Sequence, residues 1–344
     1  MDKSWSWISS EFVALTLIIV AAFCNVSVFY SFYHYLETID VPIGWRGFLL
    51  GLEPMAAFIL RLFILPWLHV RNAIAVTMAS LVLLVAVSCS YIWALSVPAL
   101  IVIRILHGAS FVLLTSGVIS LVVNFIPEEK TGQGFGILSI GTLIPYAVIP
   151  PLTETLLPCV RNEADIYAGV SIFAVLALLL LTALRRRIRE SLRGRDGVLM
   201  RRATLGEIRE NLRSKTVGLL LAAGLLIYLA HATVFYFLKN LVLQTGGGSV
   251  GLFFTLSMVT MIAVRVFGGA LLDRFNKPAM VRTGLVLLIP CFVALPFAET
   301  RTALYLLAGL YGLCIGVIMP LLSALLFSAS PPPMRGLNTN LSLF

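Results

Sequence analysis

Ten long apolar runs restrict what this chain can fold into more than any other feature. They cover residues 12–34, 46–69, 72–95, 97–126, 132–157, 164–184, 216–238, 249–272, 278–298 and 302–328. A helix needs about 20 mostly apolar residues to cross a bilayer. Because lipid offers no hydrogen bonds to an open backbone, such unbroken runs span as helices. The sequence therefore predicts an all-α polytopic membrane protein with about ten transmembrane helices.

The composition agrees with this interpretation. Hydrophobic residues make up 59% of the 344 residues and charged residues only 12%, whereas soluble domains contain about a quarter charged residues. The first apolar run is too long for a signal peptide and no small-residue cleavage pattern follows it. We expect it to be a retained helix.

Lysine and arginine are distributed unevenly between the two sides of the predicted membrane protein. Loops on the side of segment 185–215 contain 18 of them, and loops on the other side contain 4. The side richer in Lys and Arg faces the cytoplasm. The sequence therefore predicts a multi-pass protein of the cell (cytoplasmic/inner) membrane, with the N-terminus and the central loop in the cytoplasm.

Segment 185–215 accounts for most of the net charge of +9, because it contains ten arginines and one lysine against four acidic residues. Since this charge lies between membrane helices, no nucleic-acid partner is expected. One interpretation is a linker that lies on anionic membrane lipids. The other is a regulatory or partner-binding loop, and the sequence does not choose between them.

No catalytic or metal-binding motif accompanies the apolar runs. The five cysteines are scattered without a CxxC pair, and the chain contains no HExxH, GxSxG or Walker lysine motif. We therefore expect neither an enzyme, nor a metal, nor a cofactor.

The chain contains an internal repeat with an offset of about 204 residues. Nine of the identical pairs at this offset join Gly47, Arg61, Phe63, Leu68 and Asn72 to Gly251, Arg265, Phe267, Leu272 and Asn276, and Gly108, Leu121, Pro127 and Gly132 to Gly312, Leu325, Pro331 and Gly336. The first helix of each half needs a shift two residues longer, which aligns "VFY" at 28–30 with "VFY" at 234–236. Parallel repeats of this kind occur in secondary transporters.

Three segments resemble motifs of the major facilitator superfamily, and the resemblance covers essentially the whole chain. "RVFGGALLDRFNK" at 265–277 is similar to the family's loop motif, "RILHGASF" at 104–111 to its fourth-helix motif, and "FIPEEKTGQGFG" at 125–136 to its loop into the fifth helix. The resemblance implies a two-bundle architecture: a six-helix bundle at 1–184, the basic cytoplasmic linker at 185–215 and a four-helix bundle at 216–344. It also implies transport by alternating access.

The chain departs from the family pattern at three places. Leu65 and His69 stand where the first copy of the loop motif has Gly and Asp, and the fifth helix lacks the Gly-Pro-x-x-Gly-Gly pattern of drug/proton antiporters. The chain also stops at Phe344, where an eleventh helix would begin. We therefore expect a six-plus-four arrangement that lacks the last two helices of the family.

The resemblance implies a gate between the bundles at the loop motif. Gly269 would let another helix approach closely, and Asp273 would lie against the positive N-terminus of the fifth helix, with Arg274 in the headgroup layer. Arg61 and Arg265 occupy equivalent repeat positions, so a gate or packing role is expected for both.

Glu53 and Arg104 are charges inside predicted spanning helices. Each lies seven residues from the outer end of its run, which corresponds to a depth of about 10 Å, so we expect that they can pair. Charges at this depth are costly and are functional hypotheses by default. Arg104 would bind an anionic group or couple to a proton on Glu53. The alternative is an ion pair that only packs two helices.

Further polar residues in the apolar runs are candidates for a solute cavity. His107 shares the face of Arg104, Tyr228 and His231 lie on one stripe of the seventh run, and Asn25 interrupts the first run. Each histidine could instead be a packed interior residue. The surplus of cationic groups favours an anionic or zwitterionic solute. Proton coupling could use Glu53 or a histidine.

The sequence therefore predicts a secondary active transporter of a small solute, with protons and membrane lipids as further partners. The alternative is a transport-incompetent fragment or a membrane interaction protein that retains the fold.

Overall fold

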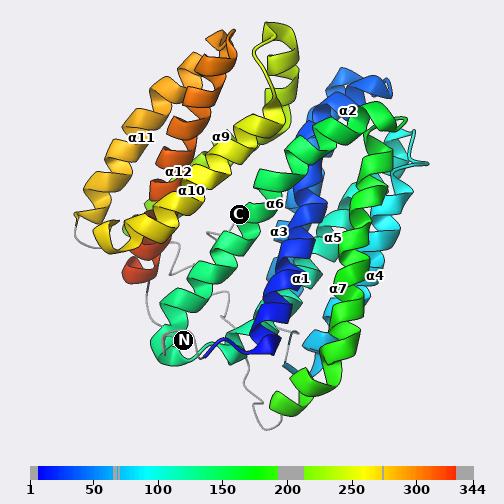
Figure 1. Cartoon of the computed structure of the whole chain (residues 1–344), viewed down its shortest axis with the longest axis vertical. Helices are drawn as coiled ribbons and strands as arrows, with labels where there is room; N and C mark the ends of the chain where they lie inside the picture. The colour runs from blue at the N-terminus through cyan, green and yellow to red at the C-terminus, as the bar shows by residue number, and fades with distance from the viewer. Residues whose placement is uncertain (1–6, 65–67, 69, 193–212, 273–274, 331–344) are drawn as a thin grey trace. The chain divides into compact units, whose positions relative to one another are not determined.

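The computed structural model describes residues 7–64, 68, 70–192, 213–272 and 275–330. These residues form α-helices and short 3₁₀ turns, with no strand among them (Figure 1). Within the described residues, ten helices are long and apolar enough to cross a membrane. The predicted fold class, an all-α multi-pass membrane protein, is confirmed.

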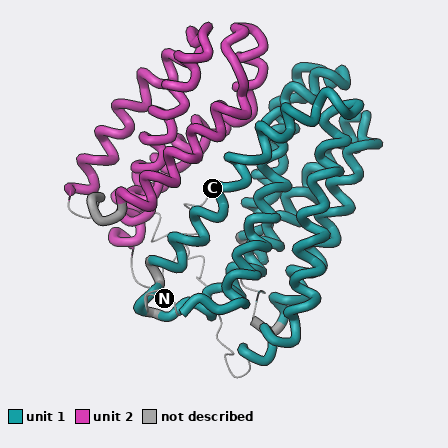
Figure 2. The backbone as a smooth tube through the Cα atoms, in the orientation of Figure 1, with its two compact units in different colours: residues 1–199 teal, residues 200–344 magenta. Residues whose placement is uncertain are grey.

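The chain divides into two compact units, Met1–Leu199 and Met200–Phe344 (Figure 2). The first unit contains α1 (Ser10–Ser27), which continues through a 3₁₀ turn at Val28–Ser31 into α2 (Phe32–Thr38), then α3 (Ile43–Ile64), α4 (Val70–Ser90), α5 (Val97–Val122), α6 (Thr131–Leu156) and α7 (Glu163–Ser191). The second contains α9 (Lys215–Thr245), α10 (Val250–Leu272), α11 (Lys277–Ala294) and α12 (Arg301–Ala329).

The basic linker is only partly described. Helix α7 continues to Ser191, into the segment predicted as a linker, and the Arg187 guanidinium pairs with Glu11 at the start of α1. Residues 193–212 lie outside the described residues. The three-part division at 184 and 215 stays a prediction.

Polar side chains set where several helices begin. Ser9, Asn162, Asn276 and Thr300 accept hydrogen bonds from the backbone N–H groups of Phe12, Ala164, Ala279 and Ala303. Such N-caps satisfy donors that a helix leaves unpaired at its first turn. Helix α9 ends at Thr245 and is capped by Gly246, whose φ of 68° lies in the left-handed region, where glycine has no steric penalty.

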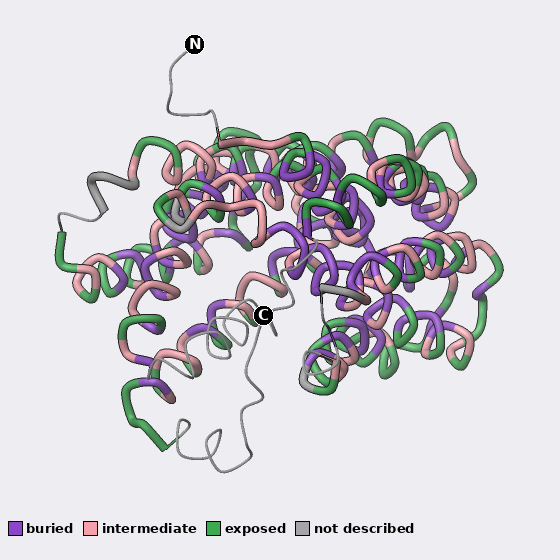
Figure 3. Tube along the Cα trace, turned by 90° about the horizontal axis from the view of Figure 1, so that it is seen from below, coloured by how far each residue is buried: buried purple, intermediate pink, exposed green. Residues whose placement is uncertain are grey.

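Burial follows the helix period in both units. Buried and exposed residues alternate along each helix (Figure 3), and the exposed ones include large apolar side chains such as Leu179, Leu226 and Ile289. In a spanning helix such faces contact lipid. Helix α1 lies inside the first unit, where it packs against α5, α6 and α7 through a buried cluster that includes Leu15 and Ile18.

The internal repeat is visible in the packing of each unit. Helix α5 packs against α3 and α4, and α12 packs against α10 and α11. A Cβ added to Gly108 would lie 2.3 Å from the Glu53 carbonyl oxygen, and one added to Gly312 would lie 2.3 Å from the Ser257 carbonyl oxygen. Both residues of the second contact lie 204 positions after those of the first, so the sequence repeat is also a repeat of helix crossings.

Candidate functional site

Arg104 of α5 binds helix α3 through several hydrogen bonds. Its Nε donates to the Leu49 carbonyl at 3.0 Å and its Nη2 to the Leu50 carbonyl at 3.1 Å. Nη2 also lies 3.5 Å from Oε2 of Glu53. Arg104 is 0% exposed and Glu53 is 7% exposed. The ion pair expected from their equal depth is therefore present inside the first unit.

Pro54 explains why α3 offers carbonyl groups to a side chain. Proline has no backbone N–H, so a proline inside a helix leaves the carbonyl four residues earlier without its donor. Pro54 lies inside α3, and the carbonyl it leaves is that of Leu50. Arg104 supplies the missing donor, and its charge also meets Glu53, the residue before the proline.

The guanidinium of Arg104 is also covered by aromatic rings. Its Cζ lies 4.5 Å from the ring centroid of Phe32 and 5.5 Å from that of Phe29. Rings at these distances attract a cation. The arginine thus joins α5 to α3 and to the turn between α1 and α2.

His107 lies one turn after Arg104 in a buried aromatic cluster. The cluster consists of Phe29, Phe32, Tyr35, Tyr91 and Tyr167, which come from α1–α2, α7 and the residues after α4. The His107 Nδ1 lies 3.3 Å from the Tyr91 hydroxyl, and its ring packs edge-on against Phe29 at 4.8 Å. Its Nε2 is buried and has no hydrogen-bond partner among the described residues.

The second unit contains a similar pair. The His231 Nδ1 of α9 is hydrogen-bonded to the Tyr311 hydroxyl of α12, and the two rings are parallel within 8°. Tyr311 occupies the repeat position of His107, and His231 that of Asn25 after the two-residue shift. Asn25 itself is 1% exposed and donates to the Ala21 carbonyl one turn earlier in α1.

The remaining predicted residues lie toward the other end of the helices. Arg61 is 8% exposed in α3, and Arg265 is half-buried in α10, close enough to Tyr228 for an electrostatic interaction. Gly269 lies in α10, which the structure describes there by its backbone. Asp273 and Arg274 lie outside the described residues. The predicted gate therefore stays a prediction.

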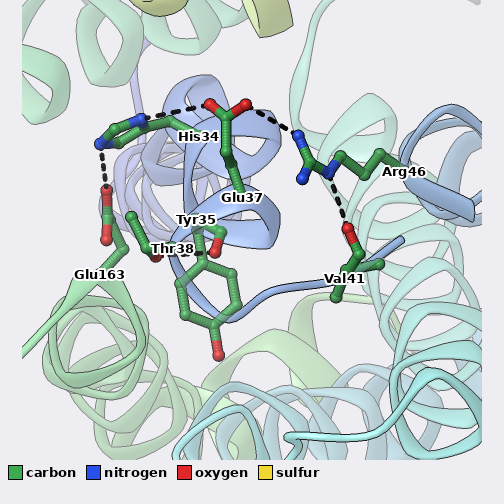
Figure 4. Close-up of polar contacts among 7 residues, drawn as sticks. All are labelled: His34, Tyr35, Glu37, Thr38, Val41, Arg46 and Glu163. Atoms are coloured by element: carbon green, nitrogen blue, oxygen red, sulfur yellow. Dashed lines mark hydrogen bonds and ion pairs between the residues drawn. The ribbon is translucent and has the colours of Figure 1, made fainter. Parts of the chain in front are cut away.

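A polar network at one end of the first unit was not predicted from the sequence (Figure 4). His34 of α2 lies 4.0 Å from a Glu37 carboxylate oxygen and 3.9 Å from one of Glu163, the first residue of α7. Arg46 of α3 pairs with Glu37 at 2.8 Å and donates from Nε to the Val41 carbonyl. The spacing of His34 and Glu37 was a visible signal, but nothing in the sequence links them to Glu163.

No group of three or more His, Cys, Asp or Glu side chains could hold a metal ion in the part of the chain that the structure describes.

Comparison with known proteins gives one family. The sequence profile of the Major Facilitator Superfamily matches residues 15–343. The structure is similar to that of the nucleoside transporter NupG, with a TM-score of 0.72 and 12% identity over 97% of this chain and 86% of that chain. No curated protein sequence matches the chain.

Two further solved structures have the same fold. A POT family transporter in complex with a thioalcohol-conjugated peptide has a TM-score of 0.66 and 13% identity over 96% of this chain and 87% of that chain. The human organic anion transporter MFSD10 (TETRAN) has a TM-score of 0.56 and 18% identity over 97% of this chain and 88% of that chain.

Proposed function

Because this chain belongs to the major facilitator superfamily of membrane transporters, we propose that it is a secondary active transporter that moves a small solute by alternating access. The ten apolar helices make it a multi-pass membrane protein. The 18-to-4 distribution of Lys and Arg supports a place in the cell membrane with cytoplasmic termini.

The observation that carries the proposal is the buried pair of Glu53 and Arg104 inside two spanning helices. A charge in the middle of a membrane costs roughly 2.5–3.5 kcal/mol on insertion scales, so the chain retains this pair at a cost to its insertion. Protonation of Glu53 would remove the charge attraction between α3 and α5 and leave Arg104 on the carbonyls of Leu49 and Leu50. Glu53 is therefore the proposed proton carrier.

The proposed solute is anionic or zwitterionic. The described spanning helices contain Arg61, Arg104 and Arg265 together with the buried acid Glu53, whereas two other buried acids, Glu11 and Glu163, lie in the first turns of α1 and α7. Histidines lie in both units. The named substrates of the similar structures, a nucleoside, a peptide and organic anions, supply a first panel of compounds to test. That panel includes neutral, zwitterionic and anionic solutes, so it also tests the proposed charge.

Glu53→Gln is expected to abolish proton-driven accumulation of the solute but to retain solute exchange. Glutamine has the same shape as glutamate and can still accept a hydrogen bond from Arg104, but its side-chain amide does not bind and release a proton near neutral pH. The measurement is uptake into proteoliposomes, first with an imposed pH gradient and then as counterflow without one.

The matched control is Glu37→Gln, because Glu37 is 46% exposed at the end of the first unit and is no part of the proposed proton site. It is expected to behave like the wild type in both assays. Accumulation by Glu53→Gln at the wild-type level would exclude Glu53 as the proton carrier.

A further inference from the structure

Both units contain a histidine whose Nδ1 is hydrogen-bonded to a tyrosine hydroxyl. In the first unit these are His107 and Tyr91, and in the second His231 and Tyr311. A neutral imidazole has one N–H donor and one acceptor nitrogen. The direction of each tyrosine bond therefore decides what the other ring nitrogen, Nε2, offers.

The surroundings of Tyr311 indicate which partner donates the His231–Tyr311 hydrogen bond in the second unit. Tyr311 is 0% exposed, and its hydroxyl has no other hydrogen bond among the described residues. If this hydroxyl accepted a hydrogen bond from Nδ1–H, its own O–H would be buried without an acceptor, which costs about 1–3 kcal/mol. Donation from Tyr311 to Nδ1 avoids this cost. His231 then carries its proton on Nε2.

The chemistry of tyrosine and histidine indicates that the tyrosine is also the donor in the first unit. A phenol is the more acidic partner and an imidazole nitrogen the more basic one, so the Tyr91 hydroxyl donates to the His107 Nδ1. The proton of His107 is then on Nε2, which is buried and has no partner among the described residues. Buried polar groups in native proteins are nearly always satisfied, so this N–H calls for a hydrogen-bond acceptor.

We propose that Tyr91 and Tyr311 are positioning residues that fix His107 and His231 in the Nε2–H tautomer, so that each unit offers a ring N–H donor to an acceptor group of the solute. The acceptor would be a carboxylate, phosphate or carbonyl oxygen. This inference rests on the proposed function for its solute. The tautomers themselves do not depend on transport.

The arrangement also defines which solutes would be rejected. A site built around a hydrogen-bond donor discriminates strongly against an analogue that lacks the matching acceptor, because the buried donor is then left unpaired. The two tyrosines would therefore determine specificity through the histidines, without contacting the solute themselves.

The test is the ¹⁵N spectrum of histidine-labelled protein in lipid nanodiscs. The chain has only 4 histidines, so single substitutions of His34, His69, His107 and His231 assign the four rings. Spectra are recorded without solute at about pH 8.5, well above the usual histidine pKa of about 6.5. We expect the Nε2–H form for His107 and His231. A predominant Nδ1–H form at either ring would overturn the proposal for that unit.

The variants Tyr91→Phe and Tyr311→Phe remove the hydroxyl and keep the ring. Each is expected to lower the ratio of Nε2–H to Nδ1–H about two- to tenfold, at its own histidine only, since a hydrogen bond contributes about 0.5–1.5 kcal/mol. The control Tyr305→Phe removes a hydroxyl from the same helix α12, where it accepts from the Ser249 N–H, and is expected to change neither ring.

An unchanged ratio in Tyr311→Phe or Tyr91→Phe would contradict a positioning role for that tyrosine. If a variant does not fold, the wild-type spectrum still decides the tautomer. Because no solute is present, a failure of this test is distinguishable from a failure of the transport proposal.

Discussion

Replacing Arg104 by methionine is expected to lower the free energy of unfolding by about 3–5 kcal/mol, the usual cost of leaving one partner of a buried ion pair alone. The variant leaves the Glu53 carboxylate and the carbonyls of Leu49 and Leu50 without the donor that Arg104 supplies. The measurement is unfolding in mixed micelles followed by circular dichroism, together with the yield of monodisperse protein.

Two further variants show whether the effect arises from the pair. Adding Glu53→Gln to Arg104→Met removes the uncompensated charge, so it is expected to restore a large part of the lost stability. The control Arg46→Met breaks a pair with Glu37, which is 46% exposed, and is expected to cost about 0–1 kcal/mol. If Arg104→Met retained wild-type stability and yield but lost transport, Arg104 would serve the solute rather than the packing of α5 on α3.

Gly312→Ala and Gly108→Ala are expected to destabilise their units by about 1–3 kcal/mol or more each, the usual cost of overpacking. In both, the added methyl group would lie 2.3 Å from a backbone carbonyl oxygen of the facing helix, and a backbone cannot move aside as a flexible side chain can. The expected result is a lower unfolding temperature and less folded protein.

The matched control for this prediction lies one turn away on the same helix. A Cβ at Gly309 would meet nothing within 4 Å, and alanine has a higher helix propensity than glycine by about 1 kcal/mol. Gly309→Ala is therefore expected to be neutral or stabilising. Equal stability of Gly312→Ala and Gly309→Ala would refute the close crossing of α10 and α12.

The fold was predictable from the sequence because each spanning helix has to be apolar along its whole length. The ten runs, the 204-residue repeat and the depth of Glu53 and Arg104 all follow from counting positions along helices. The repeat also aligned Gly108 with Gly312 before their identical contacts were known. The equal depth of Glu53 and Arg104 was sufficient to predict their ion pair, because two opposite charges at the same depth in a membrane are stabilised when they pair.

The surroundings of the site were less predictable, because they depend on how helices rotate and cross. Pro54 removes a backbone donor from α3, but the sequence does not say that Arg104 supplies a replacement. The pairing of His231 with Tyr311 joins residues 80 positions apart, and that of His34 with Glu163 joins the ends of two helices. Contacts between segments far apart in the chain cannot be predicted from the periodicity of residues within one segment.

The helix crossing that is repeated in each unit, α3 with α5 and α10 with α12, also differs between the two units. The positions equivalent to Pro54 and Arg104 are Met258 and Ala308. There Ser257, the equivalent of Glu53, donates a hydrogen bond to the Ala308 carbonyl at 3.1 Å. The charged version of the crossing therefore belongs to the first unit alone, which is why the proposed proton site is placed there.

The most direct test of the central claim, that this chain carries a solute, is counterflow into proteoliposomes. Purified protein would be reconstituted in vesicles loaded in turn with a nucleoside, a dipeptide or a small organic anion, and uptake of the labelled compound would be followed over time. We expect transient accumulation of an anionic or zwitterionic member of the panel to a higher level than in protein-free vesicles. Folded protein that accumulates only a cationic solute, or none from an extended panel of anions and zwitterions, would contradict it.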